Sequence, residues 1–322
     1  MMTCGPLHGV PREAATARYA AIDVGSNTVL LLVAERRGDL FVPVLERAEI
    51  TRLGRGVDRT GRFDPAAVED TTRVLGRYAS EARQLGVAAI ACVATSAARD
   101  ASNGADFFAA ARRAAGLAPE VISGDEEARL VWASAWRDFG GGSCELAVLD
   151  VGGGSTEIGL GSGPVPRTHQ SLQVGAVRLT ERVGPGDPPG ALGLRALSSR
   201  AAEALEPARA MAEPPPPSRL VGTAGTVTTL AAVEKALPTY DGAAVHGSEL
   251  TLEELTRLYL RLGELTTPER ARLPGMEPKR ADVIVAGCAI VLEAMRLFCF
   301  DRLTVSDRGV RWGLLYDRFG RD

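Results

Sequence analysis

Histidine and cysteine, which supply many metal ligands and nucleophiles, are scarce in this chain of 322 residues. Its three histidines, His8, His169 and His246, have no metal-ligand spacing and no paired nucleophile, so we expect core or surface roles for them. The cysteines are odd in number and form no CxxC pair, which argues against a disulfide framework and a structural zinc site. They are Cys4, Cys92, Cys144, Cys288 and Cys299. This usage predicts a reducing, cytoplasmic compartment.

Long apolar runs are also missing. No stretch reaches the ~18 uncharged apolar residues that a membrane-spanning helix needs. Residues 1–18 lack the basic start and apolar run of an export signal, so we predict there a poorly ordered leader or a start codon placed too early. The sequence therefore predicts neither export nor a membrane partner.

The chain has no excess of positive charge, since its net charge is -3 and its pI is near 5.8. No global positive field attracts nucleic acid, and an anionic substrate must be bound by local donors. Hydrophobic residues make up 45% and charged residues 24%, which is typical of a packed globular protein. Because 322 residues exceed the ~250 to 300 at which a single core stops growing, we expect two lobes with a cleft between them.

Hydrophobic periodicity and turn residues predict a mixed α/β fold. The first predicted unit, residues 19–33, is two strands joined by a tight turn at Gly25, Ser26 and Asn27. Further strands are predicted at 40–50, 87–95, 119–122, 145–151, 157–161 and 302–305. Helices are predicted at 65–85 with Asp64 as N-cap, 104–116, 125–137, 191–212, 251–263, 279–297 and after Gly309.

One segment is repeated within the chain. AIDVGSNT, residues 21–28, recurs as VLDVGGGST, residues 148–156. In each copy two apolar strand residues lead to an aspartate, a glycine turn, and then hydroxyl or amide side chains. The repetition predicts a duplicated lobe that presents similar chemistry from both sides of a cleft.

The second copy has the composition of a phosphate-binding loop. Glycines permit positive φ and carry no side chain, so successive backbone N–H groups can converge on a phosphate while hydroxyls add donors. A plain glycine-rich β-hairpin is the alternative. The flanking carboxylates Asp150 and Glu157 would repel a phosphate unless a divalent cation lay between them, and Mg²⁺ prefers such oxygen ligands. The predicted loop donors are Gly152, Gly153, Gly154, Ser155 and Thr156.

A third anion-binding element is predicted at GTAGTVTT, residues 222–229, which follows a short strand and opens a helix. Small residues and free amides at a helix N-terminus suit an anion, and Gly222, Gly225 and Thr226 are the candidate donors. A routine strand-to-helix turn is the alternative.

Two further side chains are candidates for the chemistry. Glu127, within the predicted helix start Asp125-Glu126-Glu127, could orient and deprotonate an attacking water. A cluster of helix-start acids is the alternative. Arg99 follows a buried strand and could bind a phosphate through its planar guanidinium, or it could form a surface ion pair with Asp100.

With these motifs identified, the sequence resembles the exopolyphosphatase and guanosine pentaphosphate phosphohydrolase (Ppx/GppA) family, within the actin, sugar kinase and heat-shock chaperone ATPase superfamily. The resemblance extends from about residue 21 to residue 315. Four blocks carry it: IDVGSNT (22–28), ATSAARDASN (94–103), ISGDEEARL (122–130) and LDVGGGSTE (149–157). Weaker agreement continues at 245–247, 280–282 and 305–307. The third block separates the family from its kinase relatives.

The resemblance implies two ribonuclease H-like lobes of the actin-like ATPase type with a cleft between them. They are expected at 19–127 and 128–322, with the last helix after Gly309 able to pack back on the first lobe. The resemblance also implies a homodimer, with Glu127 as catalytic base and Asp150 and Glu157 as Mg²⁺ ligands. Of the two implied phosphate loops, one is 152–156, and the other, supported by Asp23, is Gly25, Ser26, Asn27 and Thr28.

The sequence departs from the family pattern in three places. Leu30 stands where the family often has a polar or basic residue after the first loop, and Trp312 replaces a commonly acidic residue after Arg311. Substrate details at these two positions therefore do not carry over from the family. No HD-like C-terminal domain follows, so we expect a two-domain member with a reduced groove for long substrates.

Together these features predict a phosphohydrolase that removes the terminal phosphate of inorganic polyphosphate or guanosine pentaphosphate by metal-assisted attack of water. Both substrates present a terminal phosphoanhydride, so the sequence does not separate them. Two alternatives stay open: an ATP-dependent kinase with the same loops, and a regulatory protein that binds guanosine tetraphosphate or pentaphosphate with little turnover. The block around Glu127 argues against the kinase, and the intact Glu127, Asp150 and Glu157 argue against the regulator.

Overall fold

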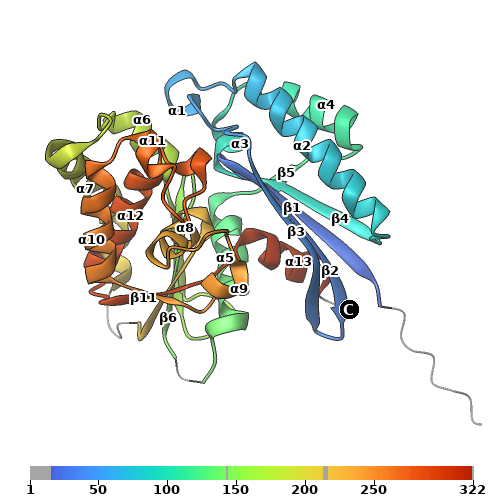
Figure 1. Ribbon diagram of the computed structural model, residues 1–322. Helices are drawn as coiled ribbons and strands as arrows, with labels where there is room; N and C mark the ends of the chain where they lie inside the picture. The colour runs from blue at the N-terminus through green and yellow to red at the C-terminus, as the bar shows by residue number, and fades with distance from the viewer. Residues whose placement is uncertain (1–15, 143, 213–216, 321–322) are drawn as a thin grey trace, which may run out of the picture.

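The computed structural model describes residues 16–142, 144–212 and 217–320, and it shows two α/β lobes side by side (Figure 1). Most of the leader predicted at 1–18 lies outside the described residues. Arg18, which the sequence assigned to that leader, instead belongs to the first strand, because it pairs with Glu35 of the next strand.

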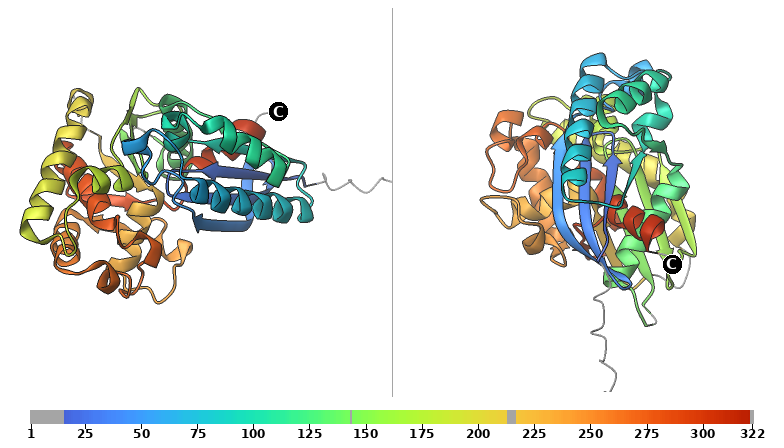
Figure 2. Two further views of the ribbon diagram at one scale, coloured as in Figure 1. Left: turned by 90° about the horizontal axis from the view of Figure 1, so that it is seen from above. Right: turned by 90° about the vertical axis from the view of Figure 1, so that its right-hand side faces the viewer.

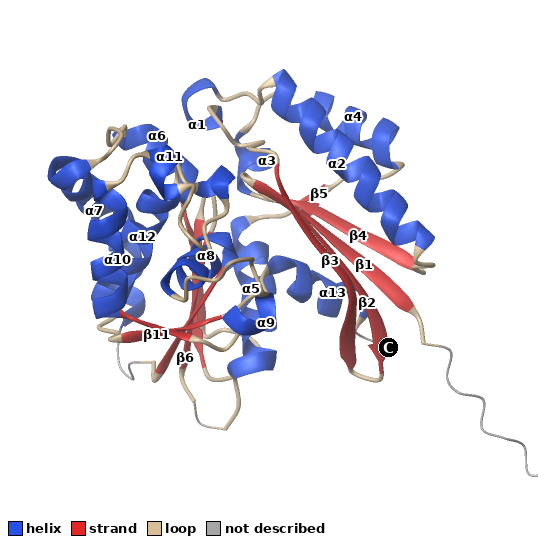
Figure 3. Cartoon of the chain, in the orientation of Figure 1, coloured by secondary structure: helices blue, strands red, loops and turns tan. Residues whose placement is uncertain are grey.

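The first lobe is built on a five-stranded sheet in the order β3-β2-β1-β4-β5 (Figure 3). Strand β1 is antiparallel to β2 and parallel to β4. The strands are β1 (Arg18–Val24), β2 (Thr28–Arg37), β3 (Leu40–Ile50), β4 (Ala89–Ala94) and β5 (Glu120–Val121). The predicted hairpin around Gly25 is therefore confirmed, and it lies at the centre of this sheet.

The second lobe repeats this strand order. Its sheet runs β10-β11-β9-β6-β7-β8, so β6 takes the place of β1, and β10 is added at one edge. Strand β6 is antiparallel to β7 and parallel to β9, as β1 is to β2 and β4. The strands are β6 (Leu146–Val151), β7 (Thr156–Gly161), β8 (Thr168–Leu172), β9 (Arg219–Thr223), β10 (Glu249–Thr251) and β11 (Arg302–Val305). The predicted fold of two ribonuclease H-like lobes is confirmed.

The helices connect these strands. Those before the second sheet are α1 (Val57–Thr60), α2 (Pro65–Gln84), α3 (Ser96–Asp100), α4 (Gly104–Ala115) and α5 (Gly124–Phe139). Those that follow are α6 (Ala176–Val183), α7 (Gly190–Leu205), α8 (Ala224–Glu234), α9 (Gly242–Val245), α10 (Leu252–Glu264), α11 (Thr267–Arg270), α12 (Ile284–Leu297) and α13 (Val310–Phe319). Within the described ranges, no helix is long and apolar enough to span a bilayer.

Helices α2 and α4 cover the outer face of the first sheet, and α7, α8, α10 and α12 contribute to the core of the second lobe (Figure 1). Helix α2 begins where expected, because the Asp64 carboxylate accepts the amide hydrogens of Ala66 and Ala67. Helix α4 ends at Ala115, and the left-handed backbone of the next residue, Gly116, closes the last turn. These terminal residues place the helices as the sequence predicted.

Helices α5 and α13 form a layer that both lobes share (Figure 2). Trp132 of α5 and Trp312 of α13 are fully buried in one apolar cluster with residues of both sheets. At the end of α13, Phe319 stacks on Tyr19 of β1 with ring centroids 4.5 Å apart. The last helix thus packs on the first lobe, whereas the division of the chain at Glu127 stays a prediction.

The prediction of one α-helix over 191–212 is wrong for the last residues of that range. Helix α7 ends at Leu205, and the chain continues as a 3₁₀ helix over Glu206–Ala212. Pro207 explains the change, because it has no N–H to donate within an α-helix.

The helix predicted at 279–297 begins too early. Residues Pro278–Arg280 form a short 3₁₀ helix, and α12 starts only at Ile284. The Val283 amide donates to the Arg280 carbonyl, a spacing of three residues that keeps this stretch tightly wound.

Candidate active site

The two predicted phosphate loops are matching turns that meet between the lobes. In the β1–β2 turn the Gly25 amide donates to the Thr28 carbonyl at 3.0 Å, and in the β6–β7 turn the Gly152 amide donates to the Ser155 carbonyl at 3.1 Å. A β-carbon placed on Gly153 would lie 3.2 Å from the β-carbon of Ser26. The repeated sequence therefore folds into repeated turns that face each other.

Positive φ, which glycine permits, is not used in these turns. None of Gly25, Gly152, Gly153 and Gly154 has a positive φ. Close approach requires glycine instead, because a β-carbon on Gly154 would lie 2.6 Å from the Ser96 Oγ, closer than real β-carbons come to other atoms. The glycines let the second turn press against the first lobe.

The second turn is anchored by its carbonyls. The Ala176 amide of α6 donates to the Gly152 carbonyl, and the Val177 amide donates to the Gly153 carbonyl, both at 2.9 Å. Throughout the described ranges, the structure provides no acceptor for the amide hydrogens of Gly153, Gly154 and Ser155. These donors are thus free to bind an anion, as the loop prediction requires.

Hydroxyl groups of the predicted loops are partly engaged. Thr156 is fully buried and its hydroxyl donates to the Val174 carbonyl at 2.6 Å, so in this structure it serves the loop rather than a ligand. The Ser26 hydroxyl accepts the Ala97 amide hydrogen at 3.1 Å and keeps its own proton to donate.

Four carboxyl groups gather beside the turns: Asp23 of β1, Glu127 of α5, Asp150 of β6 and Glu157 of β7. Their residues are only 2% to 7% exposed. Asp150 and Glu157 are direct partners in the antiparallel β6–β7 ladder, so their side chains project from the same face of the sheet. The fold therefore concentrates negative charge where the two lobes meet.

Burial and mutual repulsion raise the pKa values of these carboxyl groups. Burial and the nearby Glu127 charge raise the pKa of Asp23 to about 7, although Arg311 opposes the shift. The pKa of Asp150 is raised well above its usual value by burial, then by Glu127 and Asp23. The pKa of Glu157 is raised by burial, then by Glu127 and Asp150, while a hydrogen bond from Ser171 at 2.7 Å opposes the shift.

This carboxylate cluster fits a divalent cation that also contacts a ligand. Asp23 Oδ1 and Glu157 Oε2 are buried without a hydrogen-bond partner, which is costly unless another group satisfies them. Among the described residues no three His, Cys, Asp or Glu side chains could hold a metal ion by themselves. Mg²⁺ commonly takes one or two carboxylates and completes its shell with water and phosphate oxygens, and this donor set suits that arrangement.

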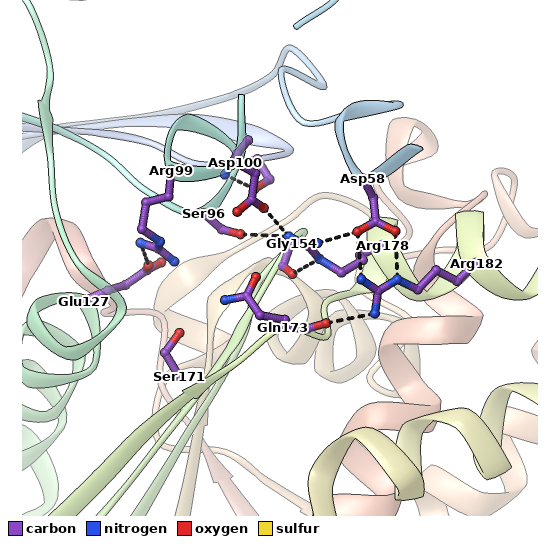
Figure 4. Close-up of polar contacts among 12 residues, drawn as sticks. Asp58, Ser96, Arg99, Asp100, Glu127, Gly154, Ser171, Gln173, Arg178 and Arg182 are labelled. Carbon is purple, nitrogen blue, oxygen red and sulfur yellow. Dashed lines mark hydrogen bonds and ion pairs between the residues drawn. The ribbon is translucent and has the colours of Figure 1, made fainter. Parts of the chain in front are cut away.

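Glu127 lies in the first turn of α5, and its carboxylate is held by Arg99 of α3 (Figure 4). Arg99 Nη1 donates to Glu127 Oε2 at 2.8 Å and to the Ile122 carbonyl at 3.0 Å, so the suggested surface pair of Arg99 with Asp100 is wrong. Burial raises the pKa of Glu127, while Arg99 and a hydrogen bond with Thr95 oppose the shift. Arg99 Nη2 is buried without a partner and remains available to an anion.

The third predicted anion element is only partly brought to the site. Gly222 lies within β9, paired with Leu149, and a β-carbon on it would meet Leu303 at 2.6 Å, so its glycine serves sheet packing. Gly225 and Thr226 are in the first turn of α8. A β-carbon on Gly225 would lie 2.2 Å from Arg280 Nη2, which places a guanidinium against this turn.

Several polar residues of the site were not identified from the sequence. Arg280 Nη2 donates to the Thr28 Oγ1 at 2.9 Å and so reaches the first loop from the second lobe. Ser171 of β8 binds Glu157, and Arg178 of α6 contacts Gly154. Arg280 belongs to the weakly matching block at 280–282, and that match was a signal by which the sequence could have identified it. Ser171 and Arg178 belong to no motif, and they reach the loops only through the folding of the chain.

The places of His169 and His246 agree with the roles predicted for them, whereas His8 lies outside the described residues. His169 is half-buried, with its Nε2 3.9 Å from Asp125, and His246 is half-buried, with its Nε2 3.9 Å from Asp138. Trp312, one of the two single-residue departures from the family pattern, is buried under the Arg308 guanidinium, 4.2 Å from its ring centroid. The other, Leu30, pairs with Asp23 across the β1–β2 ladder.

Comparison with known proteins supports the predicted resemblance. Residues 32–322 match the Ppx/GppA phosphatase family. Exopolyphosphatase 2 of Mycobacterium tuberculosis is 39% identical over 314 residues, which cover 93% of this chain and 98% of that protein. Of solved structures, a Ppx/GppA family member from Aquifex aeolicus is 35% identical with a TM-score of 0.78, covering 94% of this chain and 97% of that one. An exopolyphosphatase from Cytophaga hutchinsonii is 25% identical with a TM-score of 0.86, covering 93% and 96%.

Proposed function

Since the chain belongs to the Ppx/GppA phosphatase family, we propose that it releases the terminal phosphate of inorganic polyphosphate. Membership confirms the predicted phosphohydrolase class and argues against the kinase alternative. The observation that carries the proposal is the meeting of two glycine turns, one with free amides, beside Glu127 and its partner Arg99. Relatives named exopolyphosphatases support polyphosphate as the substrate, and guanosine pentaphosphate is a further candidate with the same terminal bond.

The chemistry proposed for the site is in-line attack of water on the terminal phosphorus. Glu127 orients the water and accepts its proton. As the new P–O bond forms, the phosphoanhydride bond between the terminal phosphate and the rest of the substrate breaks. Arg99 favours the ionised form of Glu127, which a base requires, despite burial. The free amides of Gly153, Gly154 and Ser155 are proposed to bind the phosphoryl oxygens, whose negative charge their dipoles stabilise.

Asp150 and Glu157 are proposed to hold Mg²⁺. When bound, this ion supplies positive charge that stabilises the phosphoryl oxygens during transfer. The charge of Asp23 raises the pKa of Asp150, so Asp23 lies near these ligands. It is proposed to help retain the ion rather than to react.

The family resemblance also suggests a homodimer, which a molar-mass measurement by light scattering would test. The described cysteines, Cys92, Cys144, Cys288 and Cys299, are free, which supports the proposal of a reducing, cytoplasmic compartment.

The test is phosphate release from polyphosphates of several lengths and from guanosine pentaphosphate, with Mg²⁺ and with a chelator. The proposal predicts Mg²⁺-dependent release from polyphosphate. Binding of guanosine tetraphosphate or pentaphosphate without release from any substrate would favour the regulatory alternative and contradict the proposal.

A further inference from the structure

Arg178 of α6 holds an unusual position, because its buried guanidinium contacts both lobes. Its side chain is only 10% exposed. Its Nε donates to the Gly154 carbonyl of the second turn at 2.6 Å, and its two terminal nitrogens form ion pairs with Asp58 and Asp100 (Figure 4). A further contact, at 3.4 Å, joins Nη2 to the Ser96 Oγ.

The two carboxylates that hold Arg178 come from the first lobe. Asp58 lies in α1 and Asp100 ends α3. Asp58 also accepts from Arg182 Nε at 2.7 Å, and the hydrogen bond from Arg182, followed by the charges of both arginines, lowers the pKa of Asp58. Asp58 is therefore ionised at neutral pH, and it binds α6 to the first lobe through a charged network.

Arg178 has little capacity left to bind a substrate directly. A guanidinium carries five N–H donors, and the four contacts to Gly154, Asp58, Asp100 and Ser96 engage most of them. The side chain nevertheless lines the same small cavity as Ser26, Gly153 and Gly154. Its effect on the site must therefore pass through the groups that it holds.

The contact with Gly154 determines how one loop donor points. Amides of α6 hold the carbonyls of Gly152 and Gly153, whereas the Gly154 carbonyl is held by the Arg178 side chain. In a planar trans peptide the C=O and N–H bonds point in opposite directions. Fixing the Gly154 carbonyl toward Arg178 therefore directs the Ser155 N–H away from it, with no acceptor of its own.

We propose that Arg178 is a positioning residue, which orients the Gly154–Ser155 peptide of the second phosphate loop while Asp58 and Asp100 of the first lobe hold its guanidinium. The ion pairs of Arg178 with the first lobe are thereby coupled to the direction of the Ser155 N–H in the loop. This role rests on the proposed function, because the loop matters for turnover only if it binds a phosphate. A lysine cannot replace arginine here, since a single ammonium group cannot span the carbonyl and both carboxylates.

Arg182 is the matched control. It lies one turn further along α6 and binds the same Asp58, but its remaining contact is with the Gln173 carbonyl rather than the loop. If the network merely stabilises the fold, Arg178→Gln and Arg182→Gln should affect the protein in the same way. If Arg178 positions the loop, the two variants should separate in turnover.

The experiment measures polyphosphate hydrolysis, thermal midpoint and amide hydrogen exchange for wild type, Arg178→Gln, Arg178→Lys and Arg182→Gln. We expect Arg178→Gln to lower kcat by about tenfold or more, the effect of losing a charge-assisted hydrogen bond, with KM changed less. Arg178→Lys should recover thermal stability but not kcat. Arg182→Gln should keep kcat within about twofold of wild type. If the wild type is active, equal kcat values for the Arg178→Gln and Arg182→Gln variants would overturn the proposal.

Amide exchange at Ala176 and Val177 gives a readout that does not depend on activity. These amides donate to the Gly152 and Gly153 carbonyls, so their exchange reports whether the loop stays docked on α6. Faster exchange in Arg178→Gln but not in Arg182→Gln supports the role even if the wild type releases no phosphate, in which case the proposed function fails alone. Exchange at these two amides that is unchanged in Arg178→Gln overturns the positioning role.

If Arg178→Gln does not fold, Asp100→Asn replaces it. This change leaves Arg178 in place but removes one first-lobe carboxylate that holds its guanidinium. The expected result is a folded protein with lowered kcat and faster exchange at the same two amides. Wild-type kcat and exchange in this variant would contradict the coupling between lobes and loop.

Discussion

Burial and the charge of Glu127 raise the pKa values of Asp23, Asp150 and Glu157, and the charge of Arg311, which opposes the shift at Asp23, does not cancel it there. All four carboxylates could be predicted from the sequence, since each lies in a motif next to a turn or helix start. Arg178 could not be, because its partners Gly154, Asp58 and Asp100 are far from it in sequence.

The pH dependence of stability should reveal the raised pKa of Asp23. The pKa of Asp23 is raised to about 7 from an ordinary value of 3.8, so the folded protein retains a proton that the unfolded chain loses. This contribution to stability is present below pH 3.8 and is lost as pH rises through about 7. With chelator present, the wild-type thermal midpoint should therefore fall across this window.

Asp23→Asn should make that fall shallower, because it removes one of the groups whose pKa is raised. Asp39→Asn in the exposed turn between β2 and β3 is the control and should keep the wild-type profile. An Asp23→Asn profile as steep as the wild type would show that another group causes the dependence.

The proposed metal ligands give a second prediction at this scale. Asp150→Asn and Glu157→Gln should lower activity and shift the Mg²⁺ titration to higher concentration, because each removes a negative oxygen ligand. We expect activity at limiting Mg²⁺ to fall by at least about tenfold, as when a ligand or its support is lost. A variant that loses activity but keeps the wild-type Mg²⁺ titration would contradict the metal role.

At the scale of elements, the internal repeat correctly predicted two hairpins and their turns, because a local pattern of strand, glycine and strand specifies a hairpin. Of the two glycine properties that the sequence suggested, these turns use the missing side chain and not positive φ. Positive φ is a local property, whereas the contact of Gly154 with Ser96 depends on how the lobes pack, which no local pattern records. Pro207 similarly limited α7, although its position in the sequence was visible.

Substitution of Gly153 separates a phosphate cradle from a plain hairpin. Gly153→Val places a branched side chain against Ser26 and Asn27, where the two turns meet, so ligand binding should fail more than folding does. Wild type should gain thermal stability with a non-hydrolysable polyphosphate analogue, and Gly153→Val should gain little.

Gly163→Val is a matched control, because a β-carbon there would meet the Val165 carbonyl at 3.9 Å, an ordinary contact. It should keep the wild-type gain on ligand addition. An equal gain in Gly153→Val and wild type would exclude the cradle.

At the scale of the whole molecule, duplication explains both the fold and the place of the site. Two sheets of the same strand order bring two similar turns face to face, and α5 and α13 fill the layer between the sheets. The sequence predicted the two lobes but not the docking of α6 on α1 and α3. That docking depends on paired charges, Arg178 and Arg182 with Asp58, whose meeting is decided only when the lobes assemble.

The central claim is that this assembly directs a water, through Glu127, at a terminal phosphate. The most direct measurement compares phosphate release from polyphosphate by wild type, Glu127→Gln and the control Glu126→Gln, whose side chain faces Arg318 instead. Glu127→Gln should keep ligand-induced thermal stabilisation but reduce turnover by at least about a hundredfold, the usual contribution of a positioned general base, while Glu126→Gln stays near wild type. Near-normal turnover by Glu127→Gln would contradict the account.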